Sequence, residues 1–131
     1  MHELACFTRL ALCFETLRAE APFDPDLLMR KLRENVSGCL TYDTEVWSFE
    51  YVCKPSLFFS SPDGPFYTGN EALAEYECEY IIKSRRPEGV WDINWKWADY
   101  DLEFAVSENW WKADRAVKNM LYLNGFGRLD I

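Results

Sequence analysis

Apolar residues recur at steps of three and four along several segments of this chain, which is the spacing of one face of an α-helix. The first such segment covers residues 3–19, before Pro22. Its repeating positions are Leu4, Phe7, Leu10, Ala11, Phe14 and Leu17. This pattern predicts a first helix.

A second helix is predicted from Pro25 to about Val36. Asp24 supplies an N-cap carboxylate, and Pro25 suits the first helical position. We expect Leu28, Leu32 and Val36 to form its buried stripe, and Ser37-Gly38 to end it. The first two helices should therefore pair as an antiparallel hairpin.

Two more helices are predicted in the second half of the chain. One runs from Glu71 to about Ser84 behind an Asn70 cap. Its inward positions are Leu73, Tyr76, Tyr80 and Ile81, while Glu75, Glu77 and Glu79 mostly face water. The other is capped by Ser107 and ends at Gly125. On one side it carries Trp110, Ala113, Val117, Met120, Leu121 and Asn124.

The connection between the two helix pairs is long and rich in aromatic residues. Five Pro and Gly residues between positions 55 and 69 forbid a long regular element there. Asp43 could cap a short helix to about Glu50, although residues 45–52 can also be read as a strand. Seven aromatic residues in residues 47–67 are too many for a free linker, so we expect this loop to pack on the helices.

The expected fold class is all-α, with two antiparallel helical hairpins joined by a structured loop. At 131 residues the chain fits a single domain. Its expected parts are a first hairpin (residues 1–38), a wrapping loop (39–69) and a second hairpin with a Trp-rich turn (70–131).

The charge of the chain disfavours several classes of partner. The formal net charge is −8, and acidic residues outnumber basic ones in both halves. Such a surface repels phosphate groups, so we expect no direct nucleic-acid or membrane binding through a basic face. An acidic protein can still imitate nucleic acid toward a basic partner.

The cysteines and the N-terminus indicate the compartment. Five cysteines without a C-x-x-C pair predict neither a zinc knuckle nor a complete disulfide set. We read Cys6 and Cys13, seven residues apart, as core-filling thiols rather than a metal pair. There is no apolar run long enough to span a bilayer and no signal peptide pattern, so we expect a cytoplasmic protein.

The run from Tyr80 to Trp91 resembles the repeat motif of terpenoid cyclases and protein prenyltransferase subunits, in which a glutamine precedes Gly-x-Trp. Arg85 stands at the glutamine position, and Gly89-Val90-Trp91 follows. The resemblance covers residues 70–127, which also look like uncharacterised bacterial proteins built on the same repeat. It implies part of an α/α toroid, a ring of helical hairpins. The chain lacks the cyclases' Asp-x-Asp-Asp motif and a zinc-binding set, so the resemblance implies no catalysis, metal or cofactor.

Five of the six tryptophans lie within 21 residues. They could line a pocket for an apolar or sugar-like molecule, or pack the junction of the third and fourth helices. The candidate binding residues are Trp91, Trp95, Trp97, Tyr100, Trp110 and Trp111, with Arg85, Asp92 and Asn94 as polar groups. Since adjacent Trp110 and Trp111 point about 100° apart on a helix, one of them should lie at a pocket rim or an interface.

Carboxylates near the tryptophans offer two weaker chemical hypotheses. Asp99, Asp101 and Glu103 alternate in a segment read as irregular, and they could hold a hard cation, although a solvated loop is the simpler account. Asp92 or Asp99 could form an acid–base pair with Glu108 if the tryptophans raised a carboxyl pKa. The single histidine, His2, lies near a terminus, which disfavours mechanisms that need a histidine base.

Three functions remain open on these grounds. The first is a non-catalytic interaction or assembly protein that forms a homo-oligomer or binds a protein partner through uncovered apolar helix faces. The second is a small-molecule binder or degenerate cyclase-like enzyme with a Trp-lined pocket. The third is an acidic inhibitor of a nucleic-acid-binding enzyme.

Overall fold

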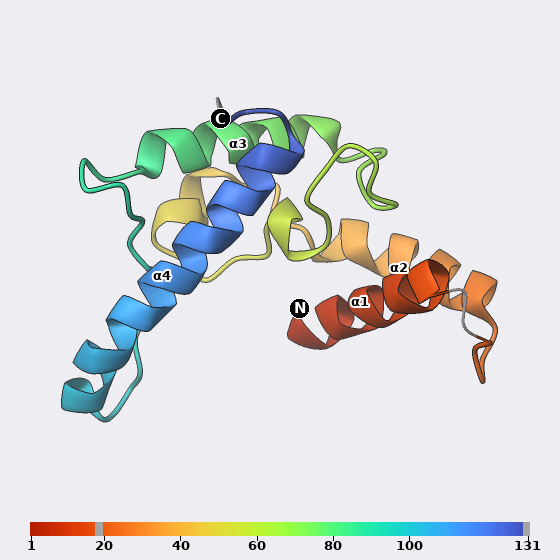
Figure 1. Ribbon diagram of the computed structural model, residues 1–131, viewed down its shortest axis with the longest axis horizontal. Helices are drawn as coiled ribbons and strands as arrows, with labels where there is room; N and C mark the ends of the chain where they lie inside the picture. The colour runs from red at the N-terminus through yellow and green to blue at the C-terminus, as the bar shows by residue number, and fades with distance from the viewer. Residues whose placement is uncertain (18–19, 130–131) are drawn as a thin grey trace.

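Four α-helices and two short 3₁₀ helices make up the described part of the chain, which is residues 1–17 and 20–129 of this computed structural model (Figure 1). The elements are α1 (His2–Leu17), α2 (Pro25–Cys39), η1 (Glu45–Ser48), η2 (Pro55–Leu57), α3 (Glu71–Ser84) and α4 (Asp101–Gly125). The described residues contain no strand, so the all-α class is confirmed and the strand reading of residues 45–52 is wrong. None of the described helices is long and apolar enough to cross a membrane.

Helices α1 and α2 pack against each other, and α2 begins as predicted. The Asp24 carboxylate accepts hydrogen bonds of 3.0 Å from the backbone N–H groups of Asp26 and Leu27, with Pro25 in the first turn. Leu32 and Val36 are buried. The helix runs past Ser37-Gly38 to Cys39, because the N–H of Leu40 still bonds to the Val36 carbonyl.

The buried face of α1 differs from its most apolar face. Ala5, Thr8 and Ala11 are buried, and the Thr8 hydroxyl donates to the Ala5 carbonyl at 2.8 Å. Small side chains let two helices approach closely. The larger apolar residues Phe7, Leu10 and Leu17 are exposed.

The assignment of Cys6 and Cys13 to the core is wrong. Both thiols are exposed on α1, since their positions fall outside the narrow buried face of small residues.

The connection from Leu40 to Asn70 packs into the core, as its aromatic content predicted. Trp47 is fully buried, and its indole N–H donates to the Thr41 carbonyl at 3.0 Å. Phe58, Phe59 and Phe66 are also buried. This loop supplies much of the larger hydrophobic cluster, so it links the hairpin of α1 and α2 to α3.

Helix α3 has nearly its predicted bounds, with two differences in its side chains. Asn70 stands at the N-cap position, but its amide instead donates to the Phe66 carbonyl at 2.8 Å and accepts from Tyr42. Tyr76 is partly exposed, whereas Glu77 is among the most buried residues. Placing Glu77 toward water was therefore wrong.

Helix α4 begins at Asp101, six residues before the predicted cap at Ser107, which lies inside the helix. Tyr100 precedes it with a left-handed backbone (φ 68°). Asp101 and Glu103 occupy the first turn, where carboxylates favour the positive end of the helix dipole. The helix ends at Gly125, as predicted.

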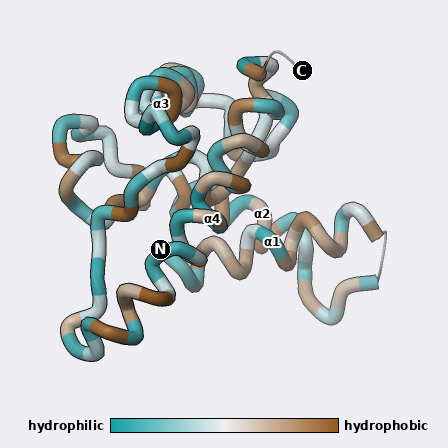
Figure 2. Tube along the Cα trace, turned by 60° about the vertical axis from the view of Figure 1, so that its left-hand side comes forward, coloured by the Kyte–Doolittle hydropathy of each residue, from teal (hydrophilic) through white to brown (hydrophobic). Residues whose placement is uncertain are grey.

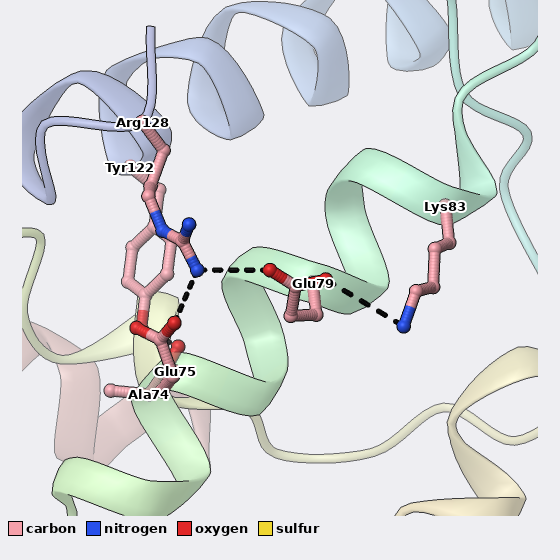
Figure 3. A network of polar contacts seen from close by, with 6 residues as sticks. All are labelled: Ala74, Glu75, Glu79, Lys83, Tyr122 and Arg128. Carbon is pink, nitrogen blue, oxygen red and sulfur yellow. Dashed lines mark hydrogen bonds and ion pairs between the residues drawn. The ribbon is translucent and has the colours of Figure 1, made fainter.

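The C-terminal end of α4 is fixed to α3 (Figure 3). Tyr122 is buried and donates to the Ala74 carbonyl at 3.5 Å. Arg128, just beyond the helix, donates to the carboxylates of Glu75 and Glu79, the latter at 2.9 Å. From this anchor α4 extends away, so that its N-terminal half projects from α3 (Figure 1).

Candidate functional site

The side of α4 opposite its packed side is apolar and faces solvent. Its members are Leu102, Val106, Trp110, Ala113, Val117, Met120 and Leu121, which we call the outer stripe. At about 100° per residue, these seven positions fall within an arc of about 100°. Leu102 is 83% exposed and Trp110 71%. Figure 2 shows hydrophobic residues recurring along α4.

The inner side of the N-terminal half of α4 is covered by residues 91–100, which precede the helix and which we call the Trp-rich segment. The ring centroid of Trp95 lies 5.8 Å from that of Phe104 and 5.2 Å from that of Trp111, both edge-to-face. The ring centroid of Trp97 also lies 5.5 Å from that of Phe104. These rings mainly contact one another, so they hold the segment before α4 against the helix.

Trp110 and Trp111 consequently lie on different sides of α4. Trp111 packs on Trp95, whereas Trp110 belongs to the outer stripe. Tyr100, at the start of the helix, is also exposed. The structure therefore does not bring the predicted binding aromatics together in one group.

Trp91 is buried at the other end of the Trp-rich segment. Its indole N–H donates to the Ile81 carbonyl at 2.7 Å, which ties the turn to the last residues of α3. Gly89 has a left-handed backbone (φ 83°), and the Arg85 guanidinium lies 3.0 Å from the place that a Cβ at Gly89 would occupy. This turn is a packed helix connection.

Asp92 lies in an exposed ion-pair network. It pairs with Arg86 and, at 3.4 Å, with Lys112, and Lys112 pairs with Glu108 at 2.8 Å. Although desolvation works in the opposite direction, the bonds from Arg86 and Lys112 lower the pKa of Asp92. The premise of the acid–base hypothesis, a carboxyl pKa raised by the tryptophans, is not met at Asp92, because Arg86 and Lys112 pair with its carboxylate.

Two polar contacts hold the Trp-rich segment to other parts of the chain. The Asn94 amide donates to the Glu50 carbonyl, and the Arg115 guanidinium donates to the Asp92 carbonyl. Two residues of the candidate set, Asp92 and Asn94, are thus bonded to other parts of the chain. Their positions are explained by packing of this segment between the loop and α4.

The carboxylates Asp99, Asp101 and Glu103 do not form a cation site. Asp101 and Glu103 lie in the first turn of α4 rather than in an irregular segment. Within residues 1–17 and 20–129, no group of three or more His, Cys, Asp or Glu side chains is placed to hold a metal ion.

Two surface hollows lie away from the tryptophans. One, of about 370 Å³, is lined by residues of α2 and the loop, including Arg33, Val36 and Phe66. The other, of about 310 Å³, lies beside Tyr42 and Tyr76 at the start of α3. No tryptophan lines either one.

A buried polar cluster that the sequence reasoning missed lies between η2 and α3. The Glu77 carboxylate accepts hydrogen bonds from the Ser56 N–H at 2.8 Å and the Ser56 hydroxyl at 2.6 Å. The sequence could have predicted the burial of Glu77, because this residue stands four positions from both Leu73 and Ile81 on the inward face of α3. Only the charge of its side chain suggested that Glu77 would face water.

Burial changes the titration of this cluster. Desolvation raises the pKa of Glu77, against the opposing effects of the Ser56 hydrogen bonds and Lys54. Lys54 lies over the rings of Trp47 and Tyr80, and burial lowers its pKa to about 8. Shifted pKa values often mark catalytic sites. Here, however, Glu77 is only 2% exposed and lines neither hollow, so its bonds to Ser56 fasten the loop to α3.

Compared with protein-family models, curated proteins and solved structures, the chain matches none. The outer stripe of α4 is the longest run of exposed apolar residues along one described helix face that packing does not explain.

Proposed function

We propose that this chain is a non-catalytic interaction protein of the cytoplasm, and that the outer stripe of α4 binds another protein chain. The exposure of the stripe carries the proposal. Leu102, Val106, Trp110, Val117 and Leu121 are all between 58% and 83% exposed. All five cysteines are free thiols, which fits a reducing compartment.

The stripe is too long and continuous for scattered surface residues. From Leu102 to Leu121 it spans about 28 Å of helix axis. Single exposed apolar residues are normal, but contiguous apolar patches mark interaction surfaces. Burying a large apolar side chain is worth about 1.5–3 kcal/mol, so a partner that covers the stripe gains several such increments.

The shape of the surface favours a protein over a small molecule. Small-molecule sites are concave, whereas one side of a projecting helix is convex. Two rings that would line a ligand pocket, Trp95 and Trp111, pack against each other, and Trp95 also packs on Phe104. The resemblance to a ring of helical hairpins stays a prediction, and it fits this proposal because a hairpin outside its ring leaves apolar faces uncovered.

The same stripe argues against an inhibitor that acts through acidity. Charged side chains would form the contact with a basic groove, yet α4 exposes a continuous stripe of apolar side chains. Apolar burial depends weakly on salt, whereas charge pairing across an interface is screened.

A photo-cross-linking amino acid at Val106 tests the proposal in the cells that make the protein. We expect a discrete cross-linked species, with a second copy or another protein, identified by mass spectrometry. The matched control carries the same group at Glu88, which is exposed in the turn after α3. No species at Val106, or the same species at both positions, would contradict a protein-binding stripe.

A further inference from the structure

We infer that the outer stripe binds the outer stripe of a second copy of this chain, with the two α4 helices antiparallel about a two-fold axis. This inference rests on the proposed function and names its partner. Three independent observations support it: the surface area, the spacing of the stripe and the distribution of charge along α4.

The chain exposes far more surface than a compact monomer of its mass. Its accessible surface is 8970 Å² for 15.4 kDa. A compact monomer of that mass exposes about 7,200 Å², so the excess is about 1,800 Å². A stable interface of standard size buries about 800 Å² on each partner. One contact with a second copy therefore accounts for a large part of the excess.

Apart from Met120, whose counterpart is Glu103, the spacing of the stripe is palindromic. Position 102 lies as far before the midpoint between residues 111 and 112 as position 121 lies after it. The same is true of positions 106 and 117, and of positions 110 and 113. A two-fold axis at this midpoint makes position i of one copy face position 223 − i of the other.

That register pairs matching side chains. Val106 packs beside Val117 of the second copy near the centre of the stripe, and Leu102 lies on the same edge as Met120 of the second copy. The large Trp110 faces the small Ala113, which leaves room for the indole when helix axes are about 8–10 Å apart. A two-fold contact needs one surface that complements itself, and this spacing provides it.

Charge along α4 favours the antiparallel arrangement. The N-terminal half carries Asp101, Glu103 and Glu108 with Lys112, and the other half carries Arg115 and Lys118 with Asp114, so their net charges are −2 and +1. Antiparallel helices place the acidic half of one copy beside the basic half of the other and also align their dipoles favourably. On one flank of the stripe this brings Glu103 near Lys118. Parallel helices would instead bring like charges together.

The position of α4 leaves the stripe accessible. The helix is anchored through Tyr122 and Arg128 at its C-terminal end, and its N-terminal half projects from α3 (Figure 1). The Trp-rich segment covers the other side of that half through Trp95 and Trp97. A second copy can therefore approach without displacing any described contact.

Cysteine cross-linking of the full chain tests the register. Val106→Cys and Val117→Cys are made in a chain whose exposed thiols are removed by Cys6→Ser and Cys13→Ser. The two single variants are mixed and treated with a short bis-maleimide. We expect the 106–117 cross-link between copies to dominate, because residues 106 and 106 lie about 16 Å apart along the axis in this register. Glu88→Cys, exposed and off the stripe, serves as the control that gives no dimer.

Two results would overturn the inference. Dominant 106–106 and 117–117 cross-links indicate parallel helices. A monomer at all concentrations in analytical ultracentrifugation excludes self-association.

The failures of the two proposals are distinguishable. A monomer that still gives a Val106 photo-cross-link to a different protein retains the proposed function and rejects the second copy. A monomer without any such species rejects both.

A second variant tests the same surface without cross-linking. Val106→Asp with Val117→Asp places two unpaired charges in the proposed contact on each chain, so we expect self-association to weaken at least about 100-fold. Both positions are exposed in the single chain, so circular dichroism should show unchanged helix content. Dimers as stable as the wild type would contradict the stripe contact.

Discussion

At the residue scale, the most informative side chain is Glu77, because its charge and its position disagree. A carboxylate is almost never fully buried without partners. Glu77 meets this need by accepting both the N–H and the hydroxyl of Ser56, and Lys54 lies close enough to affect its pKa. One acidic residue thus holds η2 against the inner face of α3.

Replacing Glu77 should separate hydrogen bonding from charge. Glu77→Ala removes the carboxylate that accepts from the Ser56 N–H and hydroxyl and creates a cavity beside Leu73 and Ile81, so we expect a loss of about 2–4 kcal/mol in the free energy of unfolding. Glu77→Gln keeps an acceptor for the Ser56 N–H and can donate to its hydroxyl, and should cost less than half as much. Urea unfolding followed by circular dichroism measures both. Equal losses would show that the charge, rather than the hydrogen bonds, is what matters.

At the element scale, helix positions could be predicted from the sequence more readily than the faces those helices bury. Asp24 and Pro25 gave the start of α2, and Gly125 gave the end of α4, because caps and breakers act locally. The start of α4 was missed because Ser107 is also a good cap residue. Periodicity finds an apolar face but not its neighbour. It could not show that the stripe of α4 faces solvent while small residues of α1 face α2.

The prediction of the candidate site failed for the same reason: the sequence does not show which element packs against an apolar face. The sequence identified the tryptophans and predicted that Trp110 and Trp111 would diverge, and they lie on different sides of α4. It could not show that Trp95 pairs with Trp111, since that contact joins residues across a turn. Spacing alone would have placed Glu77 on the inner face of α3. Its charge led instead to the prediction that it faces water.

Gly125 shows how closely α4 approaches the loop, and it yields a paired prediction. A Cβ at this position would lie 1.8 Å from the Ser60 carbonyl oxygen, so the backbone must shift. We expect Gly125→Ala to destabilise the protein by about 1–3 kcal/mol, despite the better helix propensity of alanine.

Gly38 in α2 is the matched control, because a Cβ there meets nothing within 4 Å. Gly38→Ala should stabilise the protein by about 0.5–1 kcal/mol through helix propensity alone. Differential scanning calorimetry measures both variants. Stabilisation by both would mean that the end of α4 does not press against the loop as described.

At the scale of the whole molecule, the chain has two hydrophobic clusters and a large remaining surface. The larger cluster joins α1, α2, the loop and the start of α3, and the smaller one joins α3 to the C-terminal end of α4. The projecting half of α4 contributes no buried residue to either cluster. Its order must therefore depend on the Trp-rich segment on one side and, in the proposed assembly, on a second copy on the other.

This arrangement predicts that thermal stability depends on protein concentration. If a dimer of folded chains unfolds to separate chains, a 100-fold rise in concentration favours the dimer by about 2.7 kcal/mol. For two chains of this length, that corresponds to a rise of about 5 °C in Tm. The variant with Val106→Asp and Val117→Asp should melt at a Tm that does not change with concentration, because it unfolds as a monomer. Scanning calorimetry at two concentrations compares them, and a wild-type Tm equally independent of concentration would place the stability of α4 within the single chain.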